Sequence, residues 1–235
     1  MFCLITGSSR GLGSEIALAL GRDGHNVAVH YKDREDMAKM VASGIENAII
    51  RRADVRNFEE VTRLVDDLIE EWGSIDLLVN NAGITREALL LKTSVDIFDQ
   101  VIDTNLSGPF RFTRAVSRQM IKQGGGHIIN IGSIAGIKGK AGLSAYAASK
   151  GGLVGLTLSS AAELAGYNIM VNILLPGYML TDMGKASGEK AREAALNDNL
   201  AGKFASPEMV AEFVRYLAGT TGITGQVFNL DSRIL

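Results

Sequence analysis

A tyrosine and a lysine lie four positions apart in Tyr146-Ala-Ala-Ser-Lys150, a short distance after Ser133. A spacing of four places two side chains on one face of a helix. A free tyrosine has a pKa near ~10 and is a poor acid–base catalyst, but a nearby ammonium favours its phenolate. Tyr146 is therefore a candidate general acid for a substrate carbonyl, and Ser133 a candidate hydrogen-bond donor to the same oxygen. Taken alone, the spacing is also typical of an exposed tyrosine beside a solvated lysine.

A glycine-rich turn follows the first apolar run, in Thr6-Gly7-Ser8-Ser9-Arg10-Gly11-Leu12-Gly13. Gly7 permits a tight turn, while Gly11 and Gly13 let the backbone approach a pyrophosphate and let a helix pack closely. The N-terminus of that helix offers free N–H groups to an anion. The spacing differs from the general dinucleotide fingerprint, and no Gly-Lys-Ser/Thr ends it, which excludes a P-loop. The turn therefore predicts a nucleotide-phosphate site.

The elements that must position these residues alternate along the chain. Runs of four to six apolar residues that do not alternate with polar ones indicate strands buried on both faces, as in a parallel sheet covered by helices. Repeated strand–helix units predict one doubly wound α/β domain over residues 1–235. We expect strands at 2–5, 27–30, 48–50, 76–79, 127–131, 169–174 and 226–230, and helices at 11–20, 33–43, 57–72, 94–123, 144–165 and 207–218.

Residues 182–203 interrupt this alternation. The segment is polar, contains three glycines and has few large apolar residues. Loops of this kind at the carboxyl edge of a sheet often cover a substrate. We expect a helical hairpin or a flap between the sixth strand and the last helix.

Composition narrows the classes of function. Of 235 residues, 46% are hydrophobic, and 24 Lys and Arg against 26 Asp and Glu give a net charge of −2. No basic excess is present to neutralise a phosphate backbone, which argues against nucleic-acid binding. One cysteine and three histidines without metal-ligand spacing argue against a metal site. No apolar segment reaches the length of a membrane span, and no leader pattern opens the chain, so we expect a cytoplasmic protein.

Five motifs occur in order along essentially the whole chain: the glycine turn, Asn80-Asn81-Ala82-Gly83, Ser133, Tyr146 with Lys150, and Pro176-Gly177. Together they resemble the short-chain dehydrogenase/reductase family. Within it, the segments 81–86, 131–133 and 176–183 are most similar to 3-oxoacyl-[acyl-carrier-protein] reductases. The resemblance implies a Rossmann-like, doubly wound, parallel seven-stranded sheet with helices on both faces. It also implies NADPH-dependent reduction of a 3-oxoacyl thioester bound to acyl carrier protein or CoA, as in fatty acid biosynthesis.

The resemblance assigns roles to matching residues. Asn105, Ser133, Tyr146 and Lys150 are the implied catalytic group, with Ser133 and Tyr146 also contacting substrate and Asn105 holding a water that relays protons to the lysine. Asn105 lies mid-helix, where asparagine is unfavoured, so it is alternatively a helix-kink residue near Pro109. The implied cofactor-binding residues are Gly7, Ser8, Ser9, Arg10, Gly11, Leu12, Gly13, Tyr31, Lys32, Asp54, Val55, Asn81, Ala82, Gly83, Tyr146, Lys150, Pro176, Gly177, Met179 and Thr181.

The positions after the second strand bear on the choice between NADPH and NADH. An acidic residue there would bind the ribose hydroxyls of NADH. The chain instead reads His30-Tyr31-Lys32, with no carboxylate before Asp33. Lys32 and Arg10 would form charge-assisted hydrogen bonds to a 2′-phosphate. This pattern predicts NADPH.

Two other classes of function stay open. One is a short-chain dehydrogenase acting on another small ketone or alcohol, such as acetoacetyl-CoA, a sugar or a polyketide-like compound. The other is a nucleotide-binding regulator or structural subunit without catalysis. Such proteins would normally have lost part of the catalytic group, and all four residues are present here.

The partners also follow from residue pattern and resemblance. Residues 152–163 are apolar or small nearly all round a helix, with Gly155, Ser159 and Ala162 permitting close packing, and the resemblance favours a homotetramer. Similar reductases carry basic residues shortly before the fifth strand and near the end of the catalytic helix. Segments 123–127 and 163–168 contain no arginine, so only Lys122, Arg86, Arg111, Arg114 or Arg118 are left to substitute. We therefore expect a modest preference for the acyl carrier protein over CoA.

Overall fold

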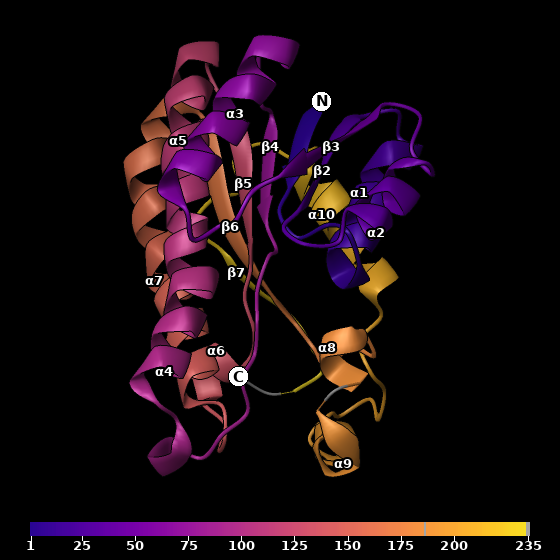
Figure 1. Ribbon diagram of the computed structural model, residues 1–235, viewed down its shortest axis with the longest axis vertical. Helices are drawn as coiled ribbons and strands as arrows, with labels where there is room; N and C mark the ends of the chain where they lie inside the picture. The colour runs from indigo at the N-terminus through magenta and orange to yellow at the C-terminus, as the bar shows by residue number, and fades with distance from the viewer. Residues whose placement is uncertain (186, 234–235) are drawn as a thin grey trace.

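The computed structural model describes residues 1–185 and 187–233, and its core is one sheet of seven parallel strands (Figure 1). The strand order is β3-β2-β1-β4-β5-β6-β7. All neighbouring pairs are parallel. The strands are β1 (Phe2–Ile5), β2 (Asn26–Tyr31), β3 (Ala48–Arg52), β4 (Leu77–Asn80), β5 (Gly126–Ile131), β6 (Ile169–Pro176) and β7 (Val227–Leu230).

Both faces of the sheet are covered, because successive strand residues point to opposite sides. In β1, Cys3 and Ile5 join the core on one face, while Leu4 joins the core on the other. The first face carries α1 (Gly11–Arg22), α2 (Glu35–Ala42) and α10 (Pro207–Ala218); the second carries α3 (Phe58–Trp72), α5 (Gly108–Gln123) and α7 (Ser144–Leu164). Among the described residues, no helix has the length and apolar character needed to cross a membrane.

The strand order places a crevice at one edge of the sheet. From β1 the chain builds outward through β2 to β3, then returns to add β4 on the other side of β1. Ligands of such sheets bind where the order reverses, beyond the carboxyl ends of the strands. Those ends face the lower part of Figure 1, between α4 (Val95–Ile102) and α6 (Ala135–Lys138) on one side and α8 (Asp182–Lys185) and α9 (Gly188–Asn197) on the other.

The predicted strands and helices occur in the predicted order, with local differences. The single helix expected at 94–123 is α4 and α5 joined by a π-helical turn, Asp103–Ser107. A four-residue helix, α6, also follows β5, where none was predicted. The segment 182–203 contains α8 and α9, which agrees with the helical form of the prediction; residue 186 within it lies outside the described residues.

A buried polar chain crosses the second face of the sheet. Asn80 Nδ2 donates to Thr113 Oγ1 at 3.2 Å and to Asn130 Oδ1 at 2.8 Å, and Asn130 Nδ2 donates to Thr157 Oγ1 at 2.9 Å. The four residues come from β4, α5, β5 and α7. Because buried polar groups are costly when unpaired, this chain favours one register of these helices on the sheet.

Candidate active site

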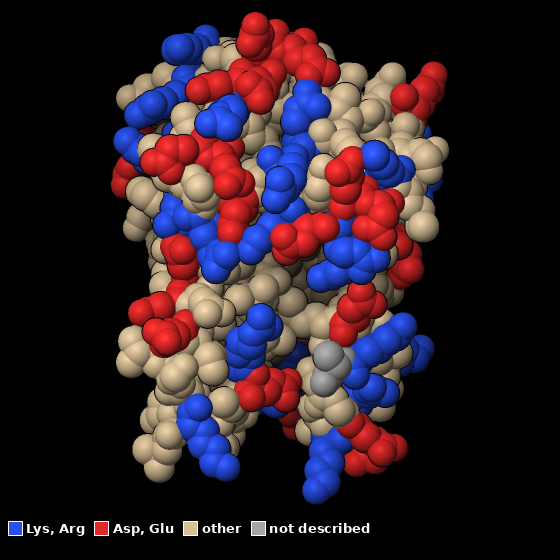
Figure 2. Space-filling model, viewed as in Figure 1, with Lys and Arg blue, Asp and Glu red and all other residues tan. Residues whose placement is uncertain are grey.

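A cleft of about 1190 Å³ opens at the carboxyl ends of the strands. Figure 2 shows the molecule divided at this end into two lobes, one over α4 and α6 and the other over α8 and α9. The cleft brings together residues that are far apart in sequence. Those of the predicted site that line it are Gly7, Ser9, Arg10, Gly11, Leu12, Tyr31, Lys32, Asp54, Val55, Asn81, Ala82, Gly83, Ser133, Tyr146, Lys150, Pro176, Gly177, Met179 and Thr181.

The glycine turn forms the floor of the cleft on the nucleotide side. Gly7 and Gly11 have φ of 64° and 60°, a conformation that favours glycine. A Cβ on Gly7 would also lie 2.8 Å from Ala82 Cα. No side chain caps the first turn of α1, which starts at Gly11. The backbone N–H groups of that turn are therefore available to a phosphate, so the turn fits a dinucleotide.

Two predicted cofactor residues, Ser8 and Gly13, do not line the cleft but shape the turn from behind. Ser8 is fully buried, donates through Oγ to Ile5 O at 2.7 Å and accepts from His30 N at 3.0 Å. A Cβ on Gly13 would lie 2.5 Å from Asn81 Nδ2 and 2.6 Å from Gly7 O. Both residues thus hold the turn against β2 and β4.

His30 also holds this turn, a role that the sequence reasoning missed. Its buried ring accepts a hydrogen bond from Gly7 N at Nδ1, 2.9 Å away, and its Nε2 lies 3.0 Å from Ala53 O. Burial lowers the pKa of His30 to about 4, so the ring is neutral and Nε2 carries the proton donated to Ala53. The imidazole therefore ties the end of β1 to the residue after β3. In the sequence, the only sign of this role is a histidine within an otherwise apolar predicted strand.

The two cations predicted to select NADPH are paired with carboxylates at the surface. Lys32 Nζ lies 3.1 Å from Asp54 Oδ2, and Arg10 Nε lies 3.9 Å from Asp182 Oδ2. Arg56, and to a lesser degree Lys32, hold the pKa of Asp54 well below its usual range. Arg34, which the sequence reasoning did not select, also lines the cleft three residues after β2. Exposed pairs of this kind contribute only about 0–1 kcal/mol, so their cations can exchange to an incoming phosphate.

Ser133, Tyr146 and Lys150 converge at the centre of the cleft. Ser133 lies between β5 and α6, and its Oγ accepts a hydrogen bond from Ala135 N at 3.2 Å. Tyr146 and Lys150 lie on the first two turns of α7. Lys150 is buried, donates to Ile131 O at 2.6 Å, and lies 5.8 Å from the centroid of the Tyr146 ring. The structure thus places a hydroxyl, a phenol and an ammonium on one wall.

From the sequence, Lys150 was expected to favour the phenolate of Tyr146 and so to lower the pKa of that phenol. The structure shows a shift in the other direction. Burial raises the pKa of Tyr146, and a side-chain hydrogen bond with Ser133 lowers it by less. Burial lowers the pKa of Lys150 to about 8. Desolvation is therefore the larger effect on the phenol, which stays protonated around neutrality and is ready to donate a proton.

Asn105 lies in the π-helical turn, buried behind the catalytic wall and outside the cleft lining. Its Oδ1 accepts from Ile84 N at 2.8 Å, and its Nδ2 donates to Ile84 O at 2.9 Å and to Ser149 Oγ at 3.1 Å. Ser149 Oγ in turn donates to Tyr146 O at 2.7 Å. The side-chain amide is therefore occupied in positioning the loop after β4 against α7, and the proton relay stays a prediction.

The flap side of the cleft is more apolar. Met183 and Leu200 line it and are 40% and 76% exposed, values that suit contact with a ligand better than with the core. The chain on either side of segment 182–203 is joined by a hydrogen bond of 2.9 Å from Ala205 N to Tyr178 O. Within the segment, Asn199 Nδ2 donates to Asp231 Oδ1 at 2.9 Å.

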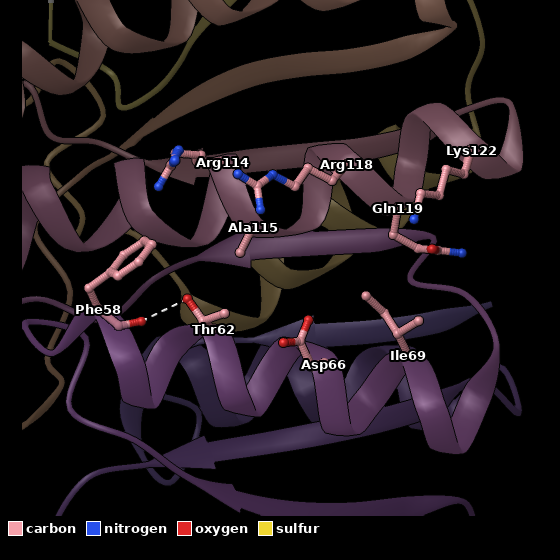
Figure 3. A pocket seen from close by; sticks show the side chains of 9 residues that line it. All are labelled: Phe58, Thr62, Asp66, Ile69, Arg114, Ala115, Arg118, Gln119 and Lys122. Atoms are coloured by element: carbon pink, nitrogen blue, oxygen red, sulfur yellow. Dashed lines mark hydrogen bonds between the residues drawn. The ribbon is translucent and has the colours of Figure 1, made fainter.

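A second pocket, of about 260 Å³, lies between α3 and α5 (Figure 3). Arg114, Arg118 and Lys122 border it from α5, and Arg114 lies 5.3 Å above the Phe58 ring. None of the predicted catalytic or cofactor residues lines it. The site chemistry therefore belongs to the larger cleft.

A doubly wound sheet with this glycine turn and this Ser–Tyr–Lys wall defines a nucleotide-dependent oxidoreductase site. The chain belongs to the short chain dehydrogenase family, whose model matches residues 2–192. It is 39% identical to the 3-oxoacyl-[acyl-carrier-protein] reductase of Thermotoga maritima, over 99% of this chain and 97% of that protein, and 42% identical to that of Synechocystis, over 97% and 94%. A short chain dehydrogenase from Burkholderia cenocepacia, solved in complex with NADP, is 34% identical, with a TM-score of 0.93 over 99% of this chain and 96% of that one.

Proposed function

We propose that the protein reduces a 3-oxoacyl thioester to the 3-hydroxyacyl thioester with NADPH. The observation that carries the proposal is the joint position of Ser133, Tyr146 and Lys150 beside the glycine turn, in one cleft. The names of the relatives from Thermotoga maritima and Synechocystis support the substrate class, and the NADP complex of the Burkholderia structure supports the cofactor.

The proposed roles follow from the contacts. When bound, NADPH supplies the hydride that the carbonyl carbon receives. The Ser133 hydroxyl donates a hydrogen bond to the carbonyl oxygen, and Tyr146 transfers its phenolic proton to that oxygen. The Lys150 ammonium then stabilises the phenolate that Tyr146 becomes. Asn105 acts as a positioning residue for α7 through Ser149.

The dinucleotide would lie along the other predicted residues. The glycine turn and the start of α1 suit its pyrophosphate, because their N–H groups are uncapped and no Cβ obstructs Gly7 or Gly11. Asp54 with Val55, and Asn81 to Gly83, would border the adenosine; Met179 and Thr181 would border the nicotinamide amide. Lys32 and Arg10 would leave their surface pairs for the 2′-phosphate.

Replacing Lys32 by Asp is expected to lower kcat/KM for NADPH by roughly 10–100-fold, the effect of losing a charged hydrogen bond and adding a like charge, while changing that for NADH far less. Steady-state kinetics with both cofactors measure this. Lys39→Asp is the matched control, because Lys39 pairs with Glu35 on α2 and does not line the cleft. Equal kinetics with NADPH and NADH in the unmutated enzyme would refute the assignment.

A pH dependence follows from Lys150. Its pKa is lowered to about 8, so its charge is present at neutral pH and is lost as the pH rises through that value. We expect kcat/KM for reduction to be level near neutrality and to fall above about pH 8, because a neutral lysine no longer stabilises the Tyr146 phenolate. In Lys150→Arg, whose charge persists, the fall should move to higher pH. If kcat/KM falls at the same pH in Lys150→Arg as in the unmutated enzyme, the role proposed for Lys150 is wrong.

The substrate class is tested directly. NADPH oxidation is followed with purified protein and 3-oxobutanoyl-CoA, and compared with a simple ketone and a sugar. We expect the thioester to be preferred, since Met183 and Leu200 offer apolar contact to an acyl chain on the flap side, and we propose that 182–203 covers it. Reduction of the ketone or sugar alone would favour the alternative short-chain dehydrogenase, and no reduction of any would favour a regulator.

We also propose a symmetric homo-oligomer, a tetramer of paired dimers. Gly155, Leu158, Ser159 and Ala162 form an exposed stripe on α7, and Leu158 is 44% exposed. Small residues let a second α7 approach closely. Light scattering that gives a 25.1 kDa particle at micromolar concentration would exclude this assembly.

A further inference from the structure

The cations around the cleft divide into two groups. On the nucleotide side, Lys32, Arg10 and Arg56 all have carboxylate partners. At the other end of the cleft, Arg86, Lys138 and Lys140 are exposed and line it. None of these three forms an ion pair within residues 1–185 and 187–233. We call Arg86, Lys138 and Lys140 the rim cations; basic side chains are visible on this lobe in Figure 2.

The fold attaches the rim cations firmly to the catalytic wall. Lys138 is the last residue of α6, which begins two residues after Ser133 and whose four residues span about 6 Å. This helix packs directly on α7, since a Cβ on Gly136 would lie 2.6 Å from Gly151 N. The loop that carries Arg86 is joined to the loop after Lys140 by a hydrogen bond of 3.0 Å from Ala88 N to Gly142 O.

The two sides of the cleft suit the two ends of a thioester. With the carbonyl at Ser133 and Tyr146, the flap offers Met183 and Leu200 to an apolar chain. The rim offers three positive charges, and Glu87 is the one carboxylate that lines the cleft from this loop. The part of the thioester that extends toward the rim should therefore carry a negative charge. A phosphate fits best, because its oxygens accept several charge-assisted hydrogen bonds from Lys and Arg at once.

We propose that the rim cations bind the phosphate of a phosphopantetheine arm on the thioester substrate. This inference rests on the proposed function and specifies its substrate. The same phosphate group is present whether the arm belongs to CoA or to acyl carrier protein. A site that binds the phosphopantetheine arm, and not the protein part of the carrier, also agrees with the modest preference for acyl carrier protein over CoA that is expected from the sequence.

The test compares two substrates that differ only in the phosphate: 3-oxobutanoyl-phosphopantetheine and 3-oxobutanoyl-pantetheine. The ratio of kcat/KM on the first to kcat/KM on the second is measured for the unmutated enzyme and for Arg86→Gln/Lys138→Gln/Lys140→Gln. We expect this ratio to fall by about tenfold in the variant, and to fall with added salt in the unmutated enzyme. Lys92→Gln is the control, because Lys92 is exposed on the same lobe but does not line the cleft, and should keep the unmutated ratio.

Parallel measurements with 3-oxobutanoyl-CoA and the carrier-bound thioester separate the sources of the phosphate. Equal losses on both in the triple variant support a shared phosphate site. If the triple variant keeps the unmutated kcat/KM ratio, the inference is wrong. A loss of kcat/KM on the CoA thioester alone also overturns it, because that loss would indicate contacts with the adenosine phosphates of CoA. A loss on the carrier-bound thioester alone overturns it as well, because that loss would indicate docking of the carrier protein. If the unmutated enzyme reduces none of these thioesters, the proposed function itself fails, whatever the variant does.

Discussion

Replacing Tyr146 by Phe is expected to lower kcat/KM for carbonyl reduction by about 10³-fold, the range that a positioned general acid contributes. The substitution removes one oxygen and keeps the ring. An ordinary phenol has a pKa near ~10 and burial raises that of Tyr146, so the unmutated enzyme holds this acid in its protonated form at neutral pH. Phenylalanine has no proton to give, and the Ser133 hydroxyl can donate a hydrogen bond without replacing it. Steady-state reduction of 3-oxobutanoyl-CoA with NADPH measures the loss.

Tyr216→Phe is the matched control for this experiment. It removes the same phenolic oxygen from a tyrosine that is 61% exposed on α10 and does not line the cleft. We expect its kinetics to match those of the unmutated enzyme. A Tyr146→Phe enzyme that retains more than a tenth of the activity would show that another group supplies the proton.

Gly13→Ala should abolish useful cofactor binding, raising the Kd for NADPH by roughly 100-fold or more. The new Cβ would lie 2.5 Å from Asn81 Nδ2, 2.6 Å from Gly7 O and 2.9 Å from Ser8 Cα, so the glycine turn must move. Two of these three atoms are backbone, which shifts less easily than the end of a side chain. Overpacking of this kind costs about 1–3 kcal/mol, or a fall in Tm of roughly 2–12 °C for a chain of this size. Fluorescence titration with NADPH and thermal melting measure the two effects.

The choice of Gly13 isolates the steric effect, because its φ does not lie in the left-handed region, unlike that of Gly7 or Gly11. Gly166→Ala introduces the same methyl group where no atom lies within 4 Å, and should leave NADPH binding as it was. An unchanged Kd in Gly13→Ala would mean that the turn tolerates a Cβ and does not need this close packing.

Much of the fold was predictable because its signals are local. Apolar runs such as residues 77–79 are buried on both faces of the sheet, and that burial makes them continuous instead of alternating. The turn from Gly7 to Gly13 combines strand, tight turn and helix start within a few residues. Tyr146 and Lys150 are one helical turn apart, so their shared face was readable without a structure. The order of strands and helices followed from these patterns, and the family and the candidate site residues followed from the resemblance of five motifs taken together.

What the sequence could not reveal depends on contacts between distant segments. The unfavoured Asn105 is a weak local sign of an irregular helix, but the π-helical turn at Asp103–Ser107 depends on contacts of Asn105 with the distant Ile84 and Ser149. Burial, which is a property of the assembled fold, lowers the pKa of His30 to about 4 and that of Lys150 to about 8.

The sequence by itself determined an α/β fold, its order of elements, the position of the glycine turn and the helical spacing of Tyr146 and Lys150, because each is a pattern over neighbouring residues. The grouping of Ser133 with these two residues followed from the resemblance of the motifs to a family. Only the tertiary structure decided which charges meet: Lys32 lies 3.1 Å from Asp54, whereas Arg86, Lys138 and Lys140 lie together at the rim without carboxylate partners among the described residues. Electrostatic interaction depends on distance in space and on exposure to water, and the sequence positions of residues 32 and 54, which follow two neighbouring strands, indicate neither.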